Sequence, residues 1–197
     1  SGKIFSSFSG FLSDVGDFFL QGGSDKQNRK LLERYRGRLE QYFERSGRNL
    51  LHLAAHPDVR RALPDFQSRF GTLYASGVLQ DMLDSCFDLD QMSLYGDTGA
   101  LLARVLRPGT AEYLPGEAFA ALRTRLRSLR GVLIEPLPDR RILVAAEFAS
   151  RMRERQGLLL MVLNGKGIAA LLEDVPDPEG FLFYLTEIGR ASCRERV

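Results

Sequence analysis

Residues 91–106, QMSLYGDTGALLARVL, decide the fold that we predict for this chain. Two apolar segments, 91–95 and 100–106, flank the tetrapeptide Gly96-Asp97-Thr98-Gly99. Glycine and aspartate tolerate the positive φ angles of tight turns, so this pattern predicts a two-stranded β-hairpin. The hairpin would open an antiparallel sheet in the middle of the chain.

The segments after the hairpin predict a helix and three further strands. Beyond the turn signals RPGT and LPGE, residues 117–130 place leucines on one side and arginines mostly on the other, as an amphipathic helix does. Residues 132–135, 141–149 and 157–163 are apolar runs separated by polar turns, which is typical of strands. The turn sequence NGKG then leads into a short predicted helix at 168–174.

A long helix is predicted before the hairpin. From Arg29 to Leu53 apolar residues recur at roughly helical spacing, and Pro57 disfavours helical geometry in the residue before it. About 28 residues at a rise of 1.5 Å would make a rod of about 40 Å. Residues 57–88 predict short helical turns that cover an end of the sheet. The expected fold class is α+β: a long N-terminal helix, then an antiparallel sheet of about five strands with flanking helices.

Composition and charge exclude several classes of protein. The chain has 197 residues, of which 44% are hydrophobic and 26% are charged, as in an ordinary globular protein. A formal net charge of +2 gives no bulk electrostatic reason to expect a nucleic acid partner. No stretch reaches the roughly 18 uninterrupted apolar residues that a membrane-spanning helix needs.

The two ends of the sequence predict a fragment of a longer gene. Residues 187–197, EIGRASCRERV, resemble a translated sequencing-adaptor read-through, and such segments are excluded from fold reasoning. Without that tail, Cys86 is the only cysteine, so we expect no intrachain disulfide and interpret Cys86 as a buried small hydrophobe. The first residue is not Met, so we expect residues 1–26 to begin within a gene, and they carry no defined fold signal.

The sequence contains no recognisable catalytic constellation, because no serine sits in a G-x-S-x-G elbow and only two histidines exist. His52 and His56 have the i, i+4 spacing that could present two imidazoles to a metal, but no further Cys or His lies nearby to complete a zinc site. Gly165-x-Gly167 is interpreted as a strand-to-helix turn, since no P-loop Lys-Ser/Thr follows it. The four arginines between residues 123 and 130 are interpreted as a solvated helix face. We therefore predict no catalytic residue, no metal and no cofactor.

The order of these elements resembles the Cache branch of PAS-like sensor domains. Three stretches carry the resemblance: LLHLAAHPDVRRAL at 50–63, QMSLYGDTGALLARV at 91–105 and ILVAAEFASRMRERQGLLLMVLNGKGIAALLED at 142–174. The resemblance covers roughly residues 27–175, with the long helix and its turn at 27–62 and the sensor domain at 63–175. Residues 176–186, which include GFLFYLTE, are similar to the opening strand of a second, membrane-proximal lobe.

The resemblance implies the extracytoplasmic, periplasmic ligand-sensing module of a bacterial transmembrane receptor. Its output domain would be a histidine kinase, a diguanylate cyclase or phosphodiesterase, or a chemoreceptor domain, and would lie outside this chain. We expect a homodimer through the long helix and membrane contact only through flanking helices. The Arg-x-Trp-Tyr type pattern of amino-acid-binding members is absent, because the chain has no Trp. The alternative is a cytoplasmic PAS-like interaction module that pairs with a partner through its long helix.

A small-molecule ligand of unknown identity is the expected partner. In the fold that the resemblance implies, the pocket lies between the sheet and the crossing segment. We chose as candidate ligand-binding residues the polar or aromatic side chains near predicted strands or the crossing helix. They are Tyr95, Arg104, Tyr113, Arg123, Glu135 and Glu147.

Overall fold

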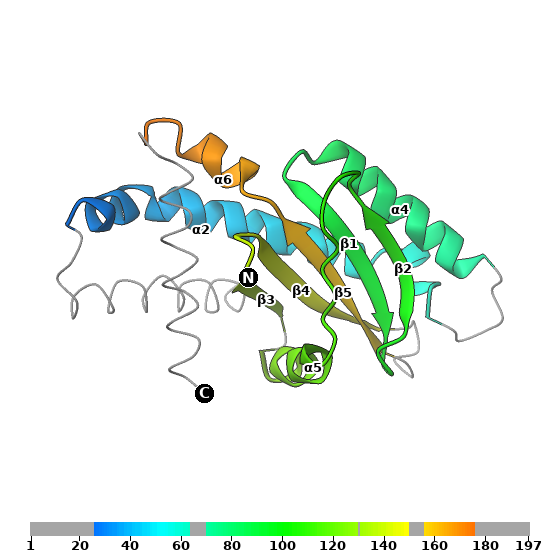
Figure 1. Ribbon diagram of the computed structural model, residues 1–197. Helices are drawn as coiled ribbons and strands as arrows, with labels where there is room; N and C mark the ends of the chain where they lie inside the picture. Colours follow the sequence, from blue (N-terminus) through cyan, green and yellow to red (C-terminus); the bar gives the residue numbers. More distant parts are fainter. Residues whose placement is uncertain (1–25, 64–69, 130, 150–155, 176–197) are drawn as a thin grey trace.

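The computed structural model describes residues 26–63, 70–129, 131–149 and 156–175. Within these ranges the chain forms a five-stranded antiparallel sheet with flanking helices, which confirms the predicted α+β class (Figure 1). The predictions for the N-terminal segment, the start of a second lobe and the foreign tail fall on residues 1–25 and 176–197, outside the described residues.

The long predicted helix is confirmed as α2, Lys26–Ala54, and the short α3, Pro57–Arg60, follows it. One side of α2 enters the core because its apolar residues recur every three or four positions. The buried hydrophobic residues of α2 are Tyr35, Leu39, Tyr42, Phe43, Leu50 and Ala54.

The prediction of short helical turns before the sheet is wrong in its second half. Residues Gly71–Ser85 form α4, a helix of 15 residues, and it packs on the face of β1 and β2 rather than at an end of the sheet. Ala75, Leu79 and Leu83 lie four positions apart and are all buried, which gives α4 a continuous apolar stripe. That stripe stabilises the whole helix, although α4 also contains Gly77, a residue of low helix propensity.

The predicted hairpin and the three later strands are confirmed. The strands are β1, Leu89–Gly96; β2, Leu101–Leu106; β3, Val132–Pro136; β4, Ile142–Ala149; and β5, Gln156–Leu163. Their order in the sheet is β2-β1-β5-β4-β3, and every neighbouring pair is antiparallel. The first and last strands therefore lie side by side in the middle of the sheet, and all eight residues of β1 are buried.

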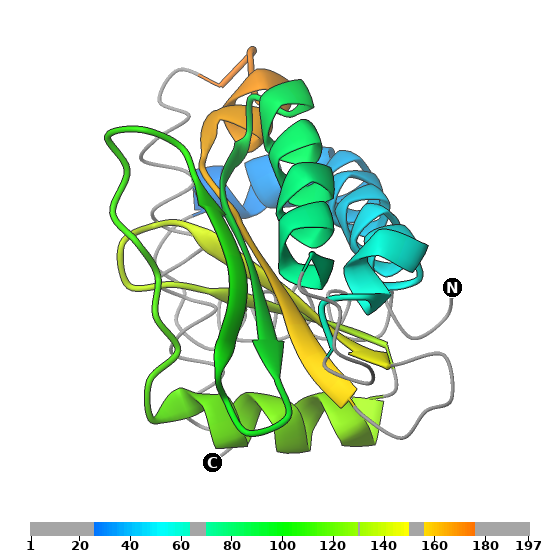
Figure 2. The same cartoon turned by 90° about the vertical axis from the view of Figure 1, so that its right-hand side faces the viewer.

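Helices cover both faces of the sheet, so two hydrophobic clusters form. Figure 2 shows α2 and α4 on one side, and α5, Ala118–Leu129, on the other. The short α6, Lys166–Leu171, joins the first side and contacts α2. Because successive strand residues point to opposite faces, Met92 and Leu94 belong to the larger cluster under α2 and α4.

The α5 side of β1 is unusual because it is polar and buried. Gln91, Ser93 and Tyr95 alternate with the apolar residues of the strand, and none of the three is more than 5% exposed. The smaller cluster on this side consists mainly of leucines from α5, β3, β4 and β5. Buried polar side chains on a central strand need partners, so this row directs attention to the α5 side.

Candidate functional site

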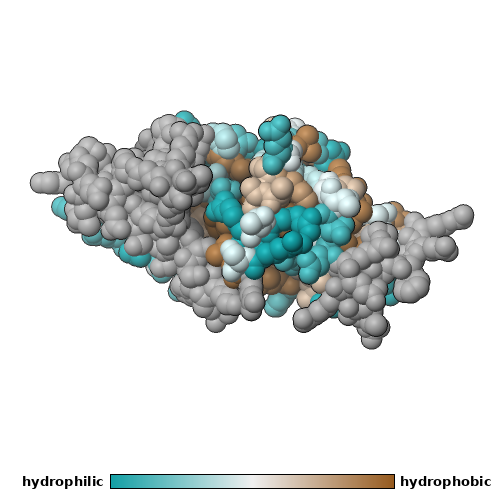
Figure 3. All heavy atoms as spheres, turned by 90° about the horizontal axis from the view of Figure 1, so that it is seen from below, coloured by the Kyte–Doolittle hydropathy of each residue, from teal (hydrophilic) through white to brown (hydrophobic). Residues whose placement is uncertain are grey.

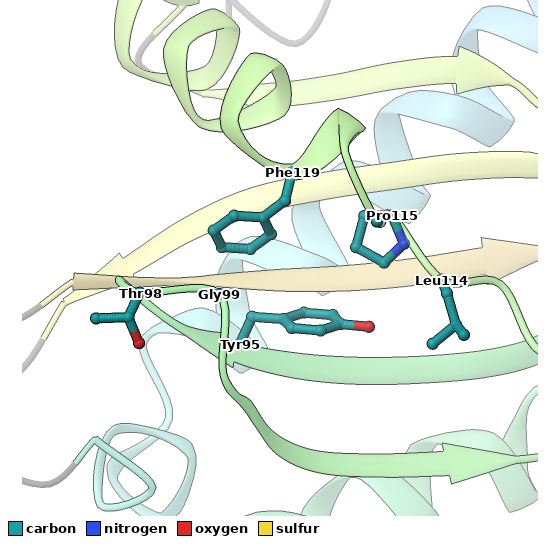
Figure 4. A pocket seen from close by; sticks show the side chains of 7 residues that line it. Tyr95, Thr98, Gly99, Leu114, Pro115 and Phe119 are labelled. Carbon is teal, nitrogen blue, oxygen red and sulfur yellow. The ribbon is translucent and has the colours of Figure 1, made fainter.

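A pocket of about 400 Å³ opens on the α5 side of the sheet, beside the turn between β1 and β2. Figure 4 shows the Tyr95 ring lying between the Thr98–Gly99 turn and Leu114, with Phe119 and Pro115 across from it. The walls therefore come from three places in the sequence: the end of the hairpin, the segment before α5 and the first turn of α5. They are lined by Tyr95, Thr98, Gly99, Leu114, Pro115, Gly116 and Phe119.

Two glycines with positive φ shape the pocket walls. Gly99 has φ +87° in the hairpin turn, and Gly116 has φ +53° just before α5. A Cβ atom at Gly99 would come into van der Waals contact with the Phe119 ring at 3.4 Å, so the left-handed backbone rather than a lack of space favours glycine here. The turn signals GDTG and LPGE thus bring the turn, the pre-helix segment and Phe119 together.

The hydroxyl of Tyr95 is buried and has no hydrogen-bond partner within the described residues. The side chain is 5% exposed, and its ring lies 5.6 Å from the Phe119 ring, centroid to centroid, with a tilt of 56° between the ring planes. In Figure 4 the hydroxyl points toward the Leu114 side of the pocket. An unpaired buried hydroxyl is uncommon in folded proteins and requires an explanation.

Burial raises the pKa of Tyr95, and the negative charge of Glu112 adds to this effect. The Ser93 hydroxyl and Arg104 act in the opposite direction. Ser93 is close enough to influence the Tyr95 phenol, but no hydrogen bond joins the two hydroxyls; the Ser93 Oγ accepts a 2.8 Å bond from the Gln91 amide. Tyr95 therefore stays protonated at neutral pH and keeps an O–H group available for donation.

Gln91 holds the segment before α5 against the sheet. Its side-chain amide donates to the Tyr113 carbonyl at 2.9 Å, and its Oε1 accepts from the Tyr113 N–H at 2.7 Å. This two-bond pairing imitates a strand ladder between a side chain and a backbone. Gln91 is 1% exposed, so the pairing is shielded from water and fixes the segment that leads to Leu114 and Pro115.

The charged residues among the predicted ligand-binding residues are paired with other protein groups. Arg104 Nη1 lies 2.6 Å from Glu112 Oε1. Glu135 Oε1 lies 2.9 Å from Arg125 Nη1, and Glu147 Oε1 lies 3.5 Å from Arg127 Nε. Arg123 donates to the backbone carbonyl of Asp97. The Arg104–Glu112 pair joins β2 to the segment before α5, and the other three contacts join α5 to β3, to β4 and to the hairpin turn.

Of the six predicted residues, Tyr95 alone lines the pocket. Tyr113 contributes through its backbone, while its half-buried side chain packs against the smaller cluster. Burial, followed by the charges of Glu135 and Tyr95, raises the pKa of Tyr113 to about 12.

Figure 3 shows a hydrophilic band on the α5 side of the molecule, in agreement with the exposed positions of Arg125 and Arg127.

Sequence reasoning missed Gln91, Leu114, Phe119 and the glycines of the wall. The sequence does indicate these elements, since LPGE predicts a turn and Phe119 lies in the predicted amphipathic helix at 117–130. Nothing in the sequence alone says that the turn and the first helical residue face the end of β1. Gln91 carries a weaker signal, which is a polar residue at the start of an apolar strand.

A smaller pocket of about 180 Å³ lies where α2, the end of α4 and β5 meet. Cys86 lines it and is half-buried, so it is less buried than the sequence predicts. Beside it, the Tyr42 hydroxyl donates to Asp88 Oδ2 at 2.5 Å. This region connects the long helix to the start of β1.

His56 and the glycine pair have structural roles. His56 is the N-cap of α3, where its Nδ1 accepts a 3.1 Å hydrogen bond from the Asp58 N–H. Gly165 caps α6, and a Cβ atom at Gly167 would lie 2.5 Å from the Tyr42 hydroxyl. The described part of the chain brings no three His, Cys, Asp or Glu residues together in a metal-binding arrangement. Among the described helices, none combines the length and apolarity needed to cross a bilayer.

No protein-family model matches the chain, and no curated protein matches it at a significant level.

Proposed function

We propose that this chain is the ligand-sensing module of a bacterial transmembrane receptor and that the pocket beside the β1–β2 turn is its ligand site. The buried, unpaired Tyr95 hydroxyl at that pocket carries the proposal. Leaving such a group unpaired costs about 1–3 kcal/mol, so a ligand that pairs with it gains from a bond that the protein alone does not make. The pocket volume of about 400 Å³ lies within the range of small-molecule sites.

The fold supports the same proposal. A long leading helix, a five-stranded antiparallel sheet and flanking helices form the architecture that the resemblance to PAS-like sensor modules implies. In such a receptor the module lies outside the cytoplasmic membrane, and the catalytic or chemotactic output domain lies elsewhere in the protein. The sequence of the complete gene tests this location, because apolar segments of about 20 residues should flank the module.

Strand β1 offers a physical connection between the pocket and the long helix. Tyr95 lies near the end of β1 and lines the pocket, whereas Asp88 immediately precedes β1 and binds Tyr42 in α2. A ligand that shifts the end of β1 would therefore act on a strand that is fastened to α2. We propose α2 as the element through which binding is transmitted.

A thermal-shift screen tests the proposed function. The panel should contain carboxylates, amines, short peptides and uncharged aromatic compounds, and at least one compound should raise the melting temperature. Leu114 and Leu101 provide matched variants, because both are exposed leucines and only Leu114 lines the pocket. Leu114→Trp should fill the pocket and abolish the shift, while Leu101→Trp should retain it. A screen without any hit, or a shift that Leu114→Trp leaves unchanged, contradicts the proposal.

Pairing of the long helix with a partner is the second candidate. The apolar residues of α2 from Tyr35 to Ala54 are already buried in the protein's own core, so a partner helix would meet its polar side. Arg38 is exposed there, and Arg36 forms an exposed pair with Glu40. A homodimer through α2 would therefore depend on charge. Sedimentation velocity at low and high salt tests it, and a dimer that Arg38→Glu dissociates would support it.

A further inference from the structure

We infer that the ligand of this pocket is an uncharged molecule with an aromatic or alicyclic body and one hydrogen-bond acceptor, which receives the Tyr95 hydroxyl. The inference rests on the proposed function, because it takes the same pocket as the ligand site. A carboxylate or amine ligand, by contrast, would need charged residues to bind it.

Among the residues that the structure describes, none that lines the pocket carries a charged side chain. Arg104, the nearest predicted candidate for binding a carboxylate, is held by Glu112 at 2.6 Å. A charged ligand that entered this space would lose part of its hydration without gaining a counter-charge, which is strongly unfavourable. The ligand that fits the lining is therefore neutral.

Two N–H groups at the start of α5 are paired within the turn that precedes the helix. The Ala118 N–H donates to the Pro115 carbonyl at 2.9 Å, and the Phe119 N–H donates to the Gly116 carbonyl at 3.2 Å. Helix N-termini bind anions through N–H groups that lack such partners. These two N–H groups are therefore not free to bind a carboxylate or phosphate.

The walls favour a ring-shaped apolar body. Phe119 and Pro115 face the Tyr95 ring across the space, and Leu114 stands at the mouth with 62% of its surface exposed (Figure 4). Exposed Leu114 gains from being covered, at about 25 cal/mol for each Å² of apolar surface removed from water. Aromatic side chains whose ring planes are tilted can also pack against the face or edge of a ring in the ligand.

The Tyr95 hydroxyl decides where the single polar group of the ligand must be. Its raised pKa keeps it protonated, so it acts as a donor to a carbonyl or ether oxygen. The hydroxyl is closed off from solvent in the unliganded protein, so the ligand must move the wall formed by residues 114–116 to reach it. Binding should therefore change amide hydrogen exchange in that wall.

Three small probes of similar shape test the inference. Acetophenone carries a ring and a neutral acceptor, benzoate carries a ring and a charge, and ethylbenzene carries a ring without an acceptor. Chemical-shift titrations of the full chain should show acetophenone binding more tightly than the other two. Tyr95→Phe should weaken acetophenone binding roughly two- to tenfold, the range for loss of one hydrogen bond, and should leave ethylbenzene unchanged. Tyr74→Phe, on the exposed side of α4, is the matched control and should change neither affinity.

The possible outcomes separate this inference from the proposed function. Tighter binding of benzoate, or acetophenone binding that Tyr95→Phe does not weaken, overturns the ligand class. The wider screen could find a charged ligand whose binding Leu114→Trp abolishes. That result would overturn the neutral ligand class but would support sensing at this pocket. Failure of every compound overturns both. Faster or slower exchange at the Leu114 and Gly116 amides with acetophenone supports contact with the wall, and unchanged exchange there contradicts it.

Discussion

The Tyr42 hydroxyl donates a 2.5 Å hydrogen bond to Asp88 Oδ2 and so joins α2 to the residue that precedes β1. Tyr42 is 3% exposed, and the α6 residue Gly167 lies so close that an added Cβ would be 2.5 Å from the Tyr42 hydroxyl and 2.8 Å from Asp88 Oδ2. Three elements that are distant in sequence therefore meet at one hydrogen bond. This contact is the point where the long helix is fastened to the sheet.

Tyr42→Phe should destabilise the protein by about 1.5–3 kcal/mol, because the removed bond joins a buried hydroxyl to a carboxylate. Urea unfolding followed by circular dichroism measures the change. Tyr74→Phe, at an exposed position of α4, is the control and should stay within about 0.5 kcal/mol of the wild type. Equal stabilities of the two variants would show that the Tyr42–Asp88 bond does not fasten α2.

Alkaline pH should reduce stability through Tyr42. Burial, followed by the hydrogen bond to Asp88 and the charge of Asp88, raises its pKa above the ordinary value of 10.0. Above about pH 10 the unfolded chain therefore loses a proton that the folded protein retains, so unfolding becomes more favourable as pH rises. Below pH 10 this group makes no pH-dependent contribution.

Tyr42→Phe isolates that contribution. The stability difference between wild type and variant should shrink by up to about 1.4 kcal/mol per pH unit above pH 10 and should be constant between pH 7 and 9. Urea unfolding of both proteins at pH 8, 10 and 11 measures it. A difference that stays constant up to pH 11 would mean that Tyr42 ionises equally easily in both states.

The sequence allowed prediction of local elements but not of the contacts between distant ones. The hairpin was predictable because Gly96 and Gly99 mark a turn and the flanking residues are apolar. The pairing of β1 with β5, which aligns Leu94 with Leu159, depends on two apolar strands whose register the local sequence does not encode. The Tyr42–Asp88 bond across 46 residues is invisible for the same reason.

The sequence indicates less about the candidate site than about the fold. Tyr95 is a candidate because it is an aromatic residue near a predicted strand. Glu135 was chosen on the same kind of argument, yet it pairs with Arg125 from the crossing helix. A polar residue near a strand has the same sequence signal whether it faces a ligand or a neighbouring side chain. The difference appears only when α5 has been placed on the sheet.

Tyr95→Phe should have the opposite sign from Tyr42→Phe. The Tyr95 hydroxyl is buried and unpaired within the described residues, so its removal relieves the cost of desolvation. We expect the free energy of unfolding to stay the same or rise by about 1 kcal/mol, measured by urea unfolding without ligand. A loss of more than 1 kcal/mol would show that a bound water or another group already satisfies the hydroxyl.

Glycine-to-alanine substitutions should separate a packing constraint from a backbone preference. A Cβ atom at Gly157 in β5 would lie 2.4 Å from the Tyr95 carbonyl oxygen and 2.5 Å from the Phe148 ring. Gly37 in α2 has no atom within 4 Å of its added Cβ. Gly157→Ala should therefore cost about 3 kcal/mol or more, while Gly37→Ala should stabilise by about 0.5–1 kcal/mol. Melting temperatures measure both, and a neutral Gly157→Ala would show that β5 can move away from β1.

Gln91 should control the wall of the pocket, because one side chain both donates to and accepts from the Tyr113 backbone. Gln91→Leu has a similar volume and leaves the Tyr113 N–H and carbonyl without this partner. We expect the free energy of unfolding to fall by about 2 kcal/mol. Two buried backbone groups lose their hydrogen-bond partner, and water replaces it only in part. Hydrogen exchange at the Tyr113 amide should accelerate by roughly 30-fold, the equivalent of that free energy. Mass spectrometry or NMR exchange measures it.

The control is Gln80→Leu on the exposed side of α4, where the glutamine donates to Asp84 at 2.8 Å. It should change stability by less than about 0.5 kcal/mol, since an exposed i, i+4 pair contributes little. In Gln91→Leu the β4–β5 amides should keep their protection, because their ladder does not involve Gln91. Acceleration spread evenly over β4 and β5 would mean that Gln91 supports the whole sheet rather than the wall. Unchanged exchange at Tyr113 would mean that the segment before α5 is held by its other contacts, such as the Arg104–Glu112 pair.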